Sequence, residues 1–456
     1  MYNETISYFQ NYHVESIGNF MVGSNNTGIL FEFDMTGPWE TKKDDNKLRY
    51  YLMEGIFPST LSIYRKELLG YFQERNLAED QYYYCHFPHF QKIHLFLSHA
   101  HESCEVILPY LNSNVNVYMS DETYLFYREV TNDFNKVVAN IVPLEADKWV
   151  DLEDIGIKLI DIKSGIPGSA GLLIEAGGCR VLYPGDLQRN GIRPEELDSF
   201  IEKYKREDID LVVSKGKYDV RHNDCQNQVG QPLYQLYQRE LSKAEGLVYL
   251  FINRRKLRDI AQLVKVSKGE GRKLVLNYDI AKLFNNMICH GYRPFGDEKA
   301  EDYLDDILVL NNDKITWADT KIYLYKEISV AEIIKNKSDY VLYLDPYNDN
   351  LMCELENPGG YYDKSVYLLF HDKYQVDSNY RYFEDDKRFK IDRKYYRTGY
   401  CLDKELLKKM VKGIGPATYI TSCMNSLNLE GIREFRFRCM GTKSLRELVE
   451  GVGYYE

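Results

Sequence analysis

The stretch LFLSHAHESC, residues 95–104, runs from an apolar segment into a tight polar turn. The apolar part predicts a buried β-strand, and the turn after it carries His99 and His101. Ser103 and Cys104 follow in the same turn. Imidazoles and thiolates are good zinc ligands, whereas a serine hydroxyl is a poor one. The stretch therefore indicates a strand-end loop that carries candidate metal ligands.

The composition of the whole chain is typical of a soluble globular protein. Its 456 residues are enough for two or three domains, and 44% of them are hydrophobic and 28% charged. No segment reaches the roughly 18 consecutive apolar residues that span a bilayer, and residues 1–5 do not begin a secretory leader. The nine cysteines contain no CxxC pair, which argues against a disulfide framework or a zinc ribbon. We expect a cytoplasmic protein with no membrane partner.

The spacing of apolar and polar segments predicts a layered α/β architecture. From about residue 206, strands and helices alternate, which is typical of a parallel sheet with crossover helices. We expect helices at residues 232–243 and 256–267. The strands expected in this part lie at residues 210–214, 247–252, 273–276, 338–344 and 365–370. Because no linker or repeat separates the two parts, the second part is expected to be inserted into the first.

Several short segments resemble the motifs of one known family. Residues 95–104 resemble an H-x-H-x-D-H loop, GIPGS at 165–169 resembles an H-S-x-P-G-S segment, and YPGD at 183–186 resembles a strand ending in Gly-Asp. Further matches, in the family's order, lie at residues 213–218, 251–257, 398–407 and 416–423. The chain thus resembles the β-CASP group of the metallo-β-lactamase superfamily, which contains RNase J and the pre-mRNA 3′-end cleavage endonucleases.

This resemblance implies a four-layer α/β/β/α metallo-β-lactamase sandwich built from residues 1–215 and 385–456. A parallel-sheet β-CASP domain would be inserted at residues 216–384, and the ancestral active site would lie in the cleft between the two. Members with intact motifs hold two zinc ions about 3.5–4 Å apart, which activate a bridging water and clamp the scissile phosphate.

The resemblance also indicates which metal ligands this chain retains. Of the expected set, His99, His101 and Asp186 are present. The remaining ligand positions hold Ser103, Cys104, Ser164 and Cys423. The two-zinc centre of the family is therefore expected to be incomplete.

Three more positions of the expected cleft bear on its chemistry. Lys215 stands at the acidic residue of the motif that opens the inserted domain, and Tyr400 stands at a histidine. His222 falls where the family often has a downstream histidine. Because the matching motifs meet at the domain interface, we expect Lys215 near Asp186 and Tyr400. An ammonium group there would repel zinc and neutralise the Asp186 carboxylate.

The metal content leaves two alternatives. Either no metal is bound, or one zinc ion is held by His99 and His101 with Asp186 and one of the thiolates of Cys104 and Cys423, or by both histidines and both thiolates. A closed site rich in thiolates is usually structural, because hydrolysis needs an open coordination position. We therefore expect a catalytically degenerate protein. If it is an enzyme, the resemblance implies a metal-dependent phosphodiester hydrolase.

The charge distribution bears on the partners. A net charge of −11 argues against indiscriminate binding of nucleic acid, which needs clustered Lys and Arg. Two basic clusters, at residues 254–258 and 387–397, are either ordinary surface charge or the lining of a phosphate-contacting groove. In the second case, RNA or DNA would contact Arg254, Arg255, Arg393, Lys394 and Arg397.

The expected function is a pseudoenzyme that binds RNA or DNA, or that scaffolds a protein partner such as an active β-CASP paralogue. One alternative is a nuclease or other hydrolase with a rearranged single-metal site. The other is a protein-interaction scaffold without nucleic acid, which the negative net charge favours and the basic clusters oppose.

Overall fold

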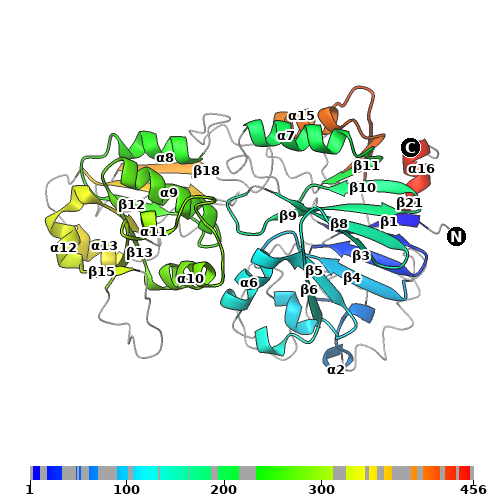
Figure 1. Ribbon diagram of the computed structural model, residues 1–456, viewed down its shortest axis with the longest axis horizontal. Helices are drawn as coiled ribbons and strands as arrows, with labels where there is room; N and C mark the ends of the chain where they lie inside the picture. The colour runs from blue at the N-terminus through cyan, green and yellow to red at the C-terminus, as the bar shows by residue number, and fades with distance from the viewer. Residues whose placement is uncertain are drawn as a thin grey trace.

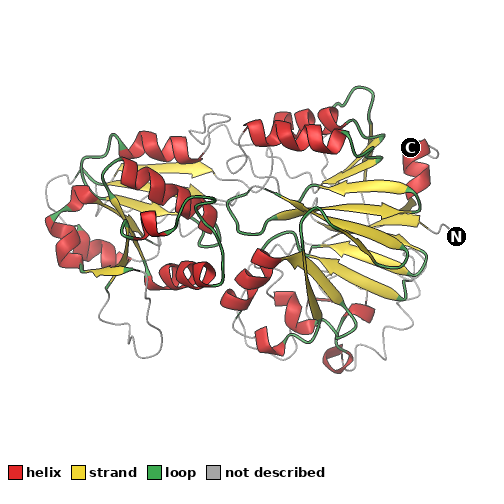
Figure 2. Ribbon diagram, in the orientation of Figure 1, coloured by secondary structure: helices red, strands yellow, loops and turns green. Residues whose placement is uncertain are grey.

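The computed structural model describes residues 4–10, 18–32, 48, 51–52, 61–69, 90–100, 106–131, 134–162, 164–185, 194–214, 233–311, 325–344, 349–356, 364–371, 392–397, 404–421, 427–437 and 441–451. These residues form two parts (Figures 1 and 2). The first part, which we call the sandwich unit, contains two seven-stranded sheets. The second, which we call the parallel-sheet unit, contains a third sheet of seven strands.

The first sheet begins with an antiparallel meander and continues as a parallel sheet. Its strands, in spatial order, are β21 (Gly441–Ser444), β1 (Glu4–Gln10), β2 (Gly18–Ser24), β3 (Thr27–Phe31), β4 (Lys92–Phe96), β5 (Asn116–Ser120) and β6 (Asn140–Leu144). Neighbours from β21 to β3 run antiparallel, and β3 to β6 run parallel. Asn25, in the turn between β2 and β3, has a φ of 46°, the left-handed conformation that a tight hairpin turn requires.

The second sheet has the same mixed character. Its strands, in spatial order, are β20 (Arg433–Arg436), β19 (Thr418–Thr421), β11 (Leu211–Ser214), β10 (Cys179–Tyr183), β9 (Ala170–Ala176), β8 (Ile155–Asp161) and β7 (Trp149–Asp151). β7 to β10 run antiparallel, and β10, β11, β19 and β20 run parallel. Gly177 and Gly178 form the turn between β9 and β10 at φ values of 57° and 77°, which glycine adopts without strain.

The two sheets of the sandwich unit pack face to face. Alternate residues of their strands form one apolar core, in which the rings of Phe31 and Tyr183 stack with centroids 5.0 Å apart. The outer face of the second sheet is covered by α7 (Pro194–Lys205) and α15 (Lys404–Ile414), and that of the first by α6 (Asp121–Val130). The sandwich unit therefore has the layer order helix, sheet, sheet, helix (Figure 2).

The parallel-sheet unit is covered by helices on both faces. All its strands are parallel, in the spatial order β15 (Lys326–Ile328), β14 (Ile307–Leu310), β13 (Lys273–Leu276), β16 (Tyr340–Tyr343), β12 (Val248–Phe251), β17 (Val366–His371) and β18 (Asp392–Arg397). One face carries α8 (Leu233–Leu241), α9 (Leu257–Gly269) and α10 (Tyr278–Cys289). The other face carries α12 (Val330–Lys335) and α13 (Asp349–Leu355).

The remaining described helices are short. They are η1 (Leu61–Ile63), α2 (Lys66–Leu69), η2 (Leu108–Tyr110), η3 (Phe134–Lys136), α11 (Glu301–Leu304), η4 (Lys337–Asp339) and α16 (Leu445–Glu450). Within the described parts of the chain, no helix has both the length and the apolar character that a bilayer crossing requires.

The layered α/β architecture expected from the sequence is confirmed. The expected strands and helices between residues 206 and 370 correspond to β11, β12, β13, β16, β17, α8 and α9. The third sheet, however, reaches Arg397 and so extends past residue 384, where the inserted domain was expected to end. The reason is that β18 pairs with β17 along its whole length.

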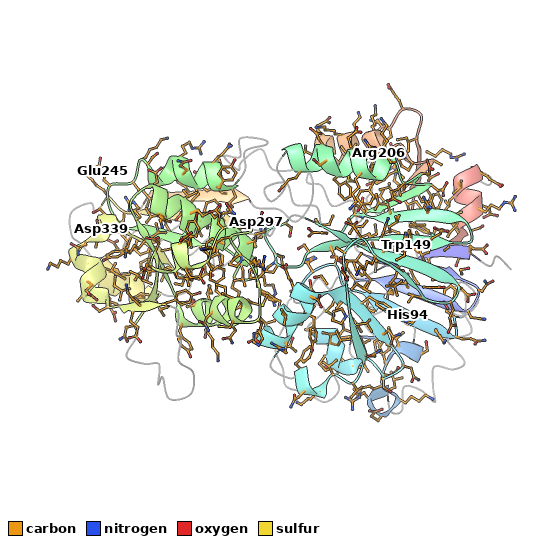
Figure 3. The ribbon with its side chains drawn as sticks, viewed as in Figure 1. His94, Trp149, Arg206, Glu245, Asp297 and Asp339 are labelled. Carbon is orange, nitrogen blue, oxygen red and sulfur yellow. The ribbon has the colours of Figure 1, made fainter. Side chains whose placement is uncertain are left out.

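One buried histidine of the sandwich unit has a shifted pKa. His94, in β4, is 6% exposed and packs edge to face against Tyr118, with ring centroids 5.5 Å apart (Figure 3). Burial lowers the pKa of His94, the nearby Lys92 lowers it further, and Glu153 opposes the shift. The folded protein therefore binds this proton less readily than the unfolded chain, in which a histidine titrates near pH 6.5.

We predict that the free energy of unfolding falls as the pH drops below about 6.5, by at most about 1.4 kcal/mol per pH unit from His94 alone. The replacement His94→Phe should remove this contribution. Urea unfolding of both proteins at pH 7.5 and 5.5 measures the difference. An identical pH dependence in the two proteins would contradict the assignment to His94.

Candidate functional site

His99 lies just beyond the end of β4, in a water-excluded position. The side chain is 3% exposed, and its Nδ1 lies 2.8 Å from Ser98 Oγ and 3.8 Å from Glu32 Oε1. The Tyr127 hydroxyl donates a hydrogen bond to the His99 carbonyl oxygen at 3.0 Å. Ser98 is fixed as well, because its carbonyl oxygen accepts from the Ala170 N–H at 2.6 Å. Ser98 and Glu32, which follow strands of the first sheet, therefore lie beside the imidazole, while α6 and the second sheet hold the main chain of this turn.

Glu32 is a site residue that the sequence did not single out. It follows β3, is 4% exposed, and has a φ of 51°. A non-glycine residue in this conformation is strained, and such strain is often found at functional sites. Its N–H donates to the Phe96 carbonyl oxygen at 2.8 Å, so the end of β3 is tied to the end of β4. The sequence gives no separate signal for Glu32, because its proximity to His99 depends on the pairing of β3 with β4.

The loop from Ser164 to Ser169, which we call the serine loop, joins β8 to β9 and pairs its two serine hydroxyl groups internally. Ser164 is 1% exposed, and its Oγ lies 2.5 Å from Ser169 Oγ and accepts from the Ile166 N–H at 3.2 Å. Ser169 Oγ also donates to the Ile166 carbonyl oxygen at 2.9 Å. Both hydroxyl groups are therefore used within the loop.

The N-terminus of α6 holds the other end of the serine loop. Ser120, which caps α6, donates to the Gly168 carbonyl oxygen at 2.6 Å, and the Thr123 hydroxyl donates to the same oxygen at 3.0 Å. The Gly168 N–H donates to Glu122 Oε2 at 2.8 Å. Gly168 has a φ of 67°, and an added Cβ would lie 2.3 Å from Ser120 Oγ. A glycine is required here for both conformation and space.

Three neighbouring parallel strands of the second sheet end at the edge that also carries the serine loop. They are β10, β11 and β19, which end at Tyr183, Ser214 and Thr421. Asp186, Lys215 and Cys423 follow these ends in the chain but lie outside the described residues. Within the sheet, Ser214 Oγ and the Tyr419 hydroxyl are 2.6 Å apart, which fixes the last residue of β11.

Most of the expected cleft positions are outside the described residues. This applies to the metal-ligand candidates His101, Cys104, Asp186 and Cys423, to Ser103, and to the cleft residues Lys215, His222 and Tyr400. His99 and Ser164 are described, and main-chain contacts between Ser98 and Ala170 place the two loops that carry them at one end of the sandwich. The predicted meeting of Lys215, Asp186 and Tyr400 stays a prediction.

The described residues supply two positions of the expected two-zinc centre, His99 and Ser164. His99 supplies an imidazole, but Ser164 supplies a neutral hydroxyl that its own loop already uses. Across the described ranges, no three His, Cys, Asp or Glu side chains are grouped so that they could hold a metal ion. Binding of one zinc ion would need ligands from positions outside those ranges.

The two basic clusters differ in the exposure and ion pairing of their side chains. In the first cluster, Arg254 is exposed, whereas the Arg255 side chain is 4% exposed. In the second, Lys394 Nζ lies 2.5 Å from Glu240 Oε2 and so neutralises a carboxylate of α8. The main chains of Arg393 and Arg397 lie in β18, and their side chains are not described. Arg254 is therefore the described member of the predicted set that is best placed to meet an anion.

The network around Glu240 shows why Lys394 faces inward. Glu240 is 4% exposed, and its burial would raise its pKa, but hydrogen bonds from Lys394, Tyr396 and Arg239 lower it overall. The pKa of Tyr396 is raised to about 12 by burial and by its hydrogen bond to Glu240. A buried carboxylate is stable only when it is paired in this way. Lys394 therefore stabilises the packing of β18 against α8.

Comparison with solved structures shows a similar fold. The crystal structure of a protein of unknown function from Enterococcus faecalis V583 matches with a TM-score of 0.73 and 18% sequence identity, over 97% of this chain and 100% of that chain. No family model and no curated protein matches the sequence. At 18% identity the likeness shows the fold alone, over nearly the whole chain.

We predict that Ser164→Ala and Ser169→Ala each lower the free energy of unfolding by about 1–3 kcal/mol, because each leaves a buried polar group unpaired. The double variant should be less destabilised than the sum of the two, since it removes both partners. Urea unfolding measures all three variants. Ser113→Ala, at an exposed turn, is the matched control and should change stability by less than about 0.5 kcal/mol. Strictly additive effects would contradict the pairing of the two hydroxyl groups.

Proposed function

We propose that this chain is a catalytically degenerate member of the β-CASP group of the metallo-β-lactamase superfamily. The helix, sheet, sheet, helix order of the sandwich unit supports the assignment, as does the insertion of the parallel-sheet unit between β11 and α15. The segments that resemble the family motifs follow the ends of β4, β10, β11 and β12. Strand ends are where a fold can fix ligand side chains rigidly.

The observation that supports a loss of catalysis is the burial and hydrogen bonding of the Ser164 hydroxyl group. It stands where the resemblance requires a metal-binding histidine, and its hydroxyl is buried and bonded to Ser169 and Ile166. A neutral oxygen that is already hydrogen bonded is a poor substitute for an imidazole ligand. Without a complete ligand set, a second zinc ion cannot help to activate water and clamp a phosphate. The proposal is therefore binding without hydrolysis.

The proposed ligand is single-stranded RNA or DNA, or a protein partner such as an active β-CASP paralogue. Arg254 supports the nucleic-acid proposal, because it is exposed in the turn between β12 and α9. A guanidinium in such a turn can contact a phosphate, which positions a nucleic acid without reading its sequence. The net charge of −11 makes a local contact surface more reasonable than binding over the whole protein.

One observation favours a second candidate, a hydrolase with a single zinc ion. His99 Nδ1 lies beside Ser98 Oγ and within 3.8 Å of the Glu32 carboxylate. Metal-binding histidines commonly turn one ring nitrogen to such an oxygen, which orients the other nitrogen for the metal. His101, Cys104, Asp186 and Cys423 would then complete the site. The same experiment distinguishes this candidate from the first.

We predict that the full-length protein binds short single-stranded RNA or DNA at low salt and leaves it intact when Mg²⁺, Mn²⁺ or Zn²⁺ is present. Fluorescence anisotropy measures binding, and gel electrophoresis of the same samples measures cleavage. Arg254→Ala should weaken binding and reduce the slope of log affinity against log salt by about 1, because one phosphate contact is lost.

Arg206→Ala is the matched control, since Arg206 is an exposed arginine beyond α7 on the sandwich unit (Figure 3). It should bind like the wild-type protein. Metal-dependent cleavage that Asp186→Asn abolishes would overturn the degenerate assignment and establish the single-metal hydrolase. Absence of binding at low salt would rule out the nucleic-acid role and favour the protein scaffold.

A further inference from the structure

The serine loop also contacts the parallel-sheet unit. The carbonyl oxygen of Gly165 accepts a hydrogen bond from the Arg258 N–H at 3.0 Å. Arg258 lies in the first turn of α9, where main-chain N–H groups have no acceptor within the helix. The N-cap residue of α9, Lys256, makes no side-chain capping bond. A carbonyl group from the sandwich unit therefore caps a helix of the parallel-sheet unit.

A side chain at position 165 would displace the Asp259 carboxylate. An added Cβ would lie 2.1 Å from Asp259 Oδ2, and the other two carboxyl atoms would lie within 2.8 Å. Its φ lies outside the left-handed region, so backbone conformation alone would tolerate a side chain. Asp259 is 9% exposed and belongs to the first turn of α9. Because Gly165 has no side chain, the Asp259 carboxylate packs directly against the serine loop.

Apolar packing joins the two units at the same place. Ile166, in the middle of the serine loop, is 2% exposed. It belongs to one hydrophobic core that includes Phe126 of α6, Leu257 of α9 and Phe284 of α10. The core of the sandwich unit on this side therefore continues into the parallel-sheet unit without a solvent layer. Such a shared core resists separation, because opening it would expose apolar surface to water.

A second polar contact lies between α6 and α10. Asn286 Nδ2 donates to Glu129 Oε2 at 2.8 Å, and His290 Nδ1 lies 3.9 Å from Glu129 Oε1. Tyr292, just beyond α10, is 6% exposed. Burial raises its pKa, and Glu122 of α6 raises it further. Two helices of the parallel-sheet unit, α9 and α10, therefore contact the sandwich unit.

We propose that the serine loop is a fixed joint between the two units. The Gly165 carbonyl caps α9, and the Asp259 carboxylate packs against the α-carbon of Gly165. The two units therefore do not separate without unfolding. This inference does not rest on the proposed function, because the contacts of Gly165, Ile166 and Gly168 are independent of any metal or ligand. Its consequence is that a partner meets a surface of fixed geometry rather than two hinged parts.

Hydrogen exchange of the wild-type protein tests the joint without any substitution. If the joint is fixed, the Arg258 amide should open only by global unfolding and should exchange as slowly as the amides of β10. If the units part in the native state, the Arg258 amide should exchange at least about 100-fold faster than those amides. The second result would overturn the proposal.

The replacement Gly165→Ala tests the contact itself. The added methyl group should displace the Asp259 carboxylate and loosen the first turn of α9, so that exchange at Arg258 and in residues 164–169 becomes at least about 10-fold faster while β10 is unchanged. Gly269→Ala is the matched control, because Gly269 ends α9 and an added Cβ would meet nothing within 4 Å. It should leave the exchange pattern unchanged.

Two results with the variants would contradict the fixed joint. One is an exchange pattern in Gly165→Ala that equals that of Gly269→Ala. The other is faster exchange that spreads equally over both units, which would indicate a general loss of stability. If Gly165→Ala does not fold, the wild-type comparison of Arg258 with β10 decides the proposal by itself.

Discussion

The serine loop carries buried hydroxyl and main-chain groups that need hydrogen-bond partners, and its contacts with the surrounding elements follow from this constraint. An unpaired hydroxyl or amide in a buried position would cost about 1–3 kcal/mol. Ser164 and Ser169 pair with each other, the two main-chain groups of Gly168 pair with α6, and the Gly165 carbonyl pairs with α9. The loop therefore connects the two sheets of the sandwich unit, its outer helix and the inserted unit.

The need to pair buried polar groups in the serine loop also bears on the proposed loss of catalysis. In the proposed ancestry a histidine at position 164 would bind a cation, and the charge of that cation would balance the acidic ligands nearby. A serine at this position needs no cation, because its hydroxyl is satisfied by neutral groups of the loop. The buried imidazole of His99 faces Glu32 and Ser98 in a similar local arrangement. Hydrogen bonds within the protein can thus hold this end of the sandwich unit together.

Sequence patterns predicted the buried strands well, because those strands are continuous apolar runs. The edge strands were harder: β18 has the sequence DRKYYR, which suggests a basic surface segment rather than a strand. It is a strand because Lys394 neutralises the buried Glu240 and Tyr396 stacks on Phe370 with ring centroids 5.3 Å apart. Neither contact can be inferred without knowing that α8 and β17 lie beside this segment.

Only part of the predicted site can be located in the described residues. The resemblance pointed to His99 and Ser164, which lie in the loops that follow β4 and β8. Glu32 was missed because a carboxylate after a strand has no evident role until the His99 ring is placed beside it. Arg255 was expected to meet a ligand, yet it is buried, because charge in a sequence does not reveal which side chains face solvent. The contact of Gly165 with Asp259 likewise depends on how the two units meet.

The metal content of the full-length protein tests the central claim most directly. Protein purified without chelators, from cells grown with zinc and manganese, should contain well below one equivalent of metal per chain by elemental analysis. His99→Ala should not change that value. Two tightly bound metal ions per chain, lost together in Asp186→Asn, would contradict the account, because they would require a complete ligand set despite the serine at position 164.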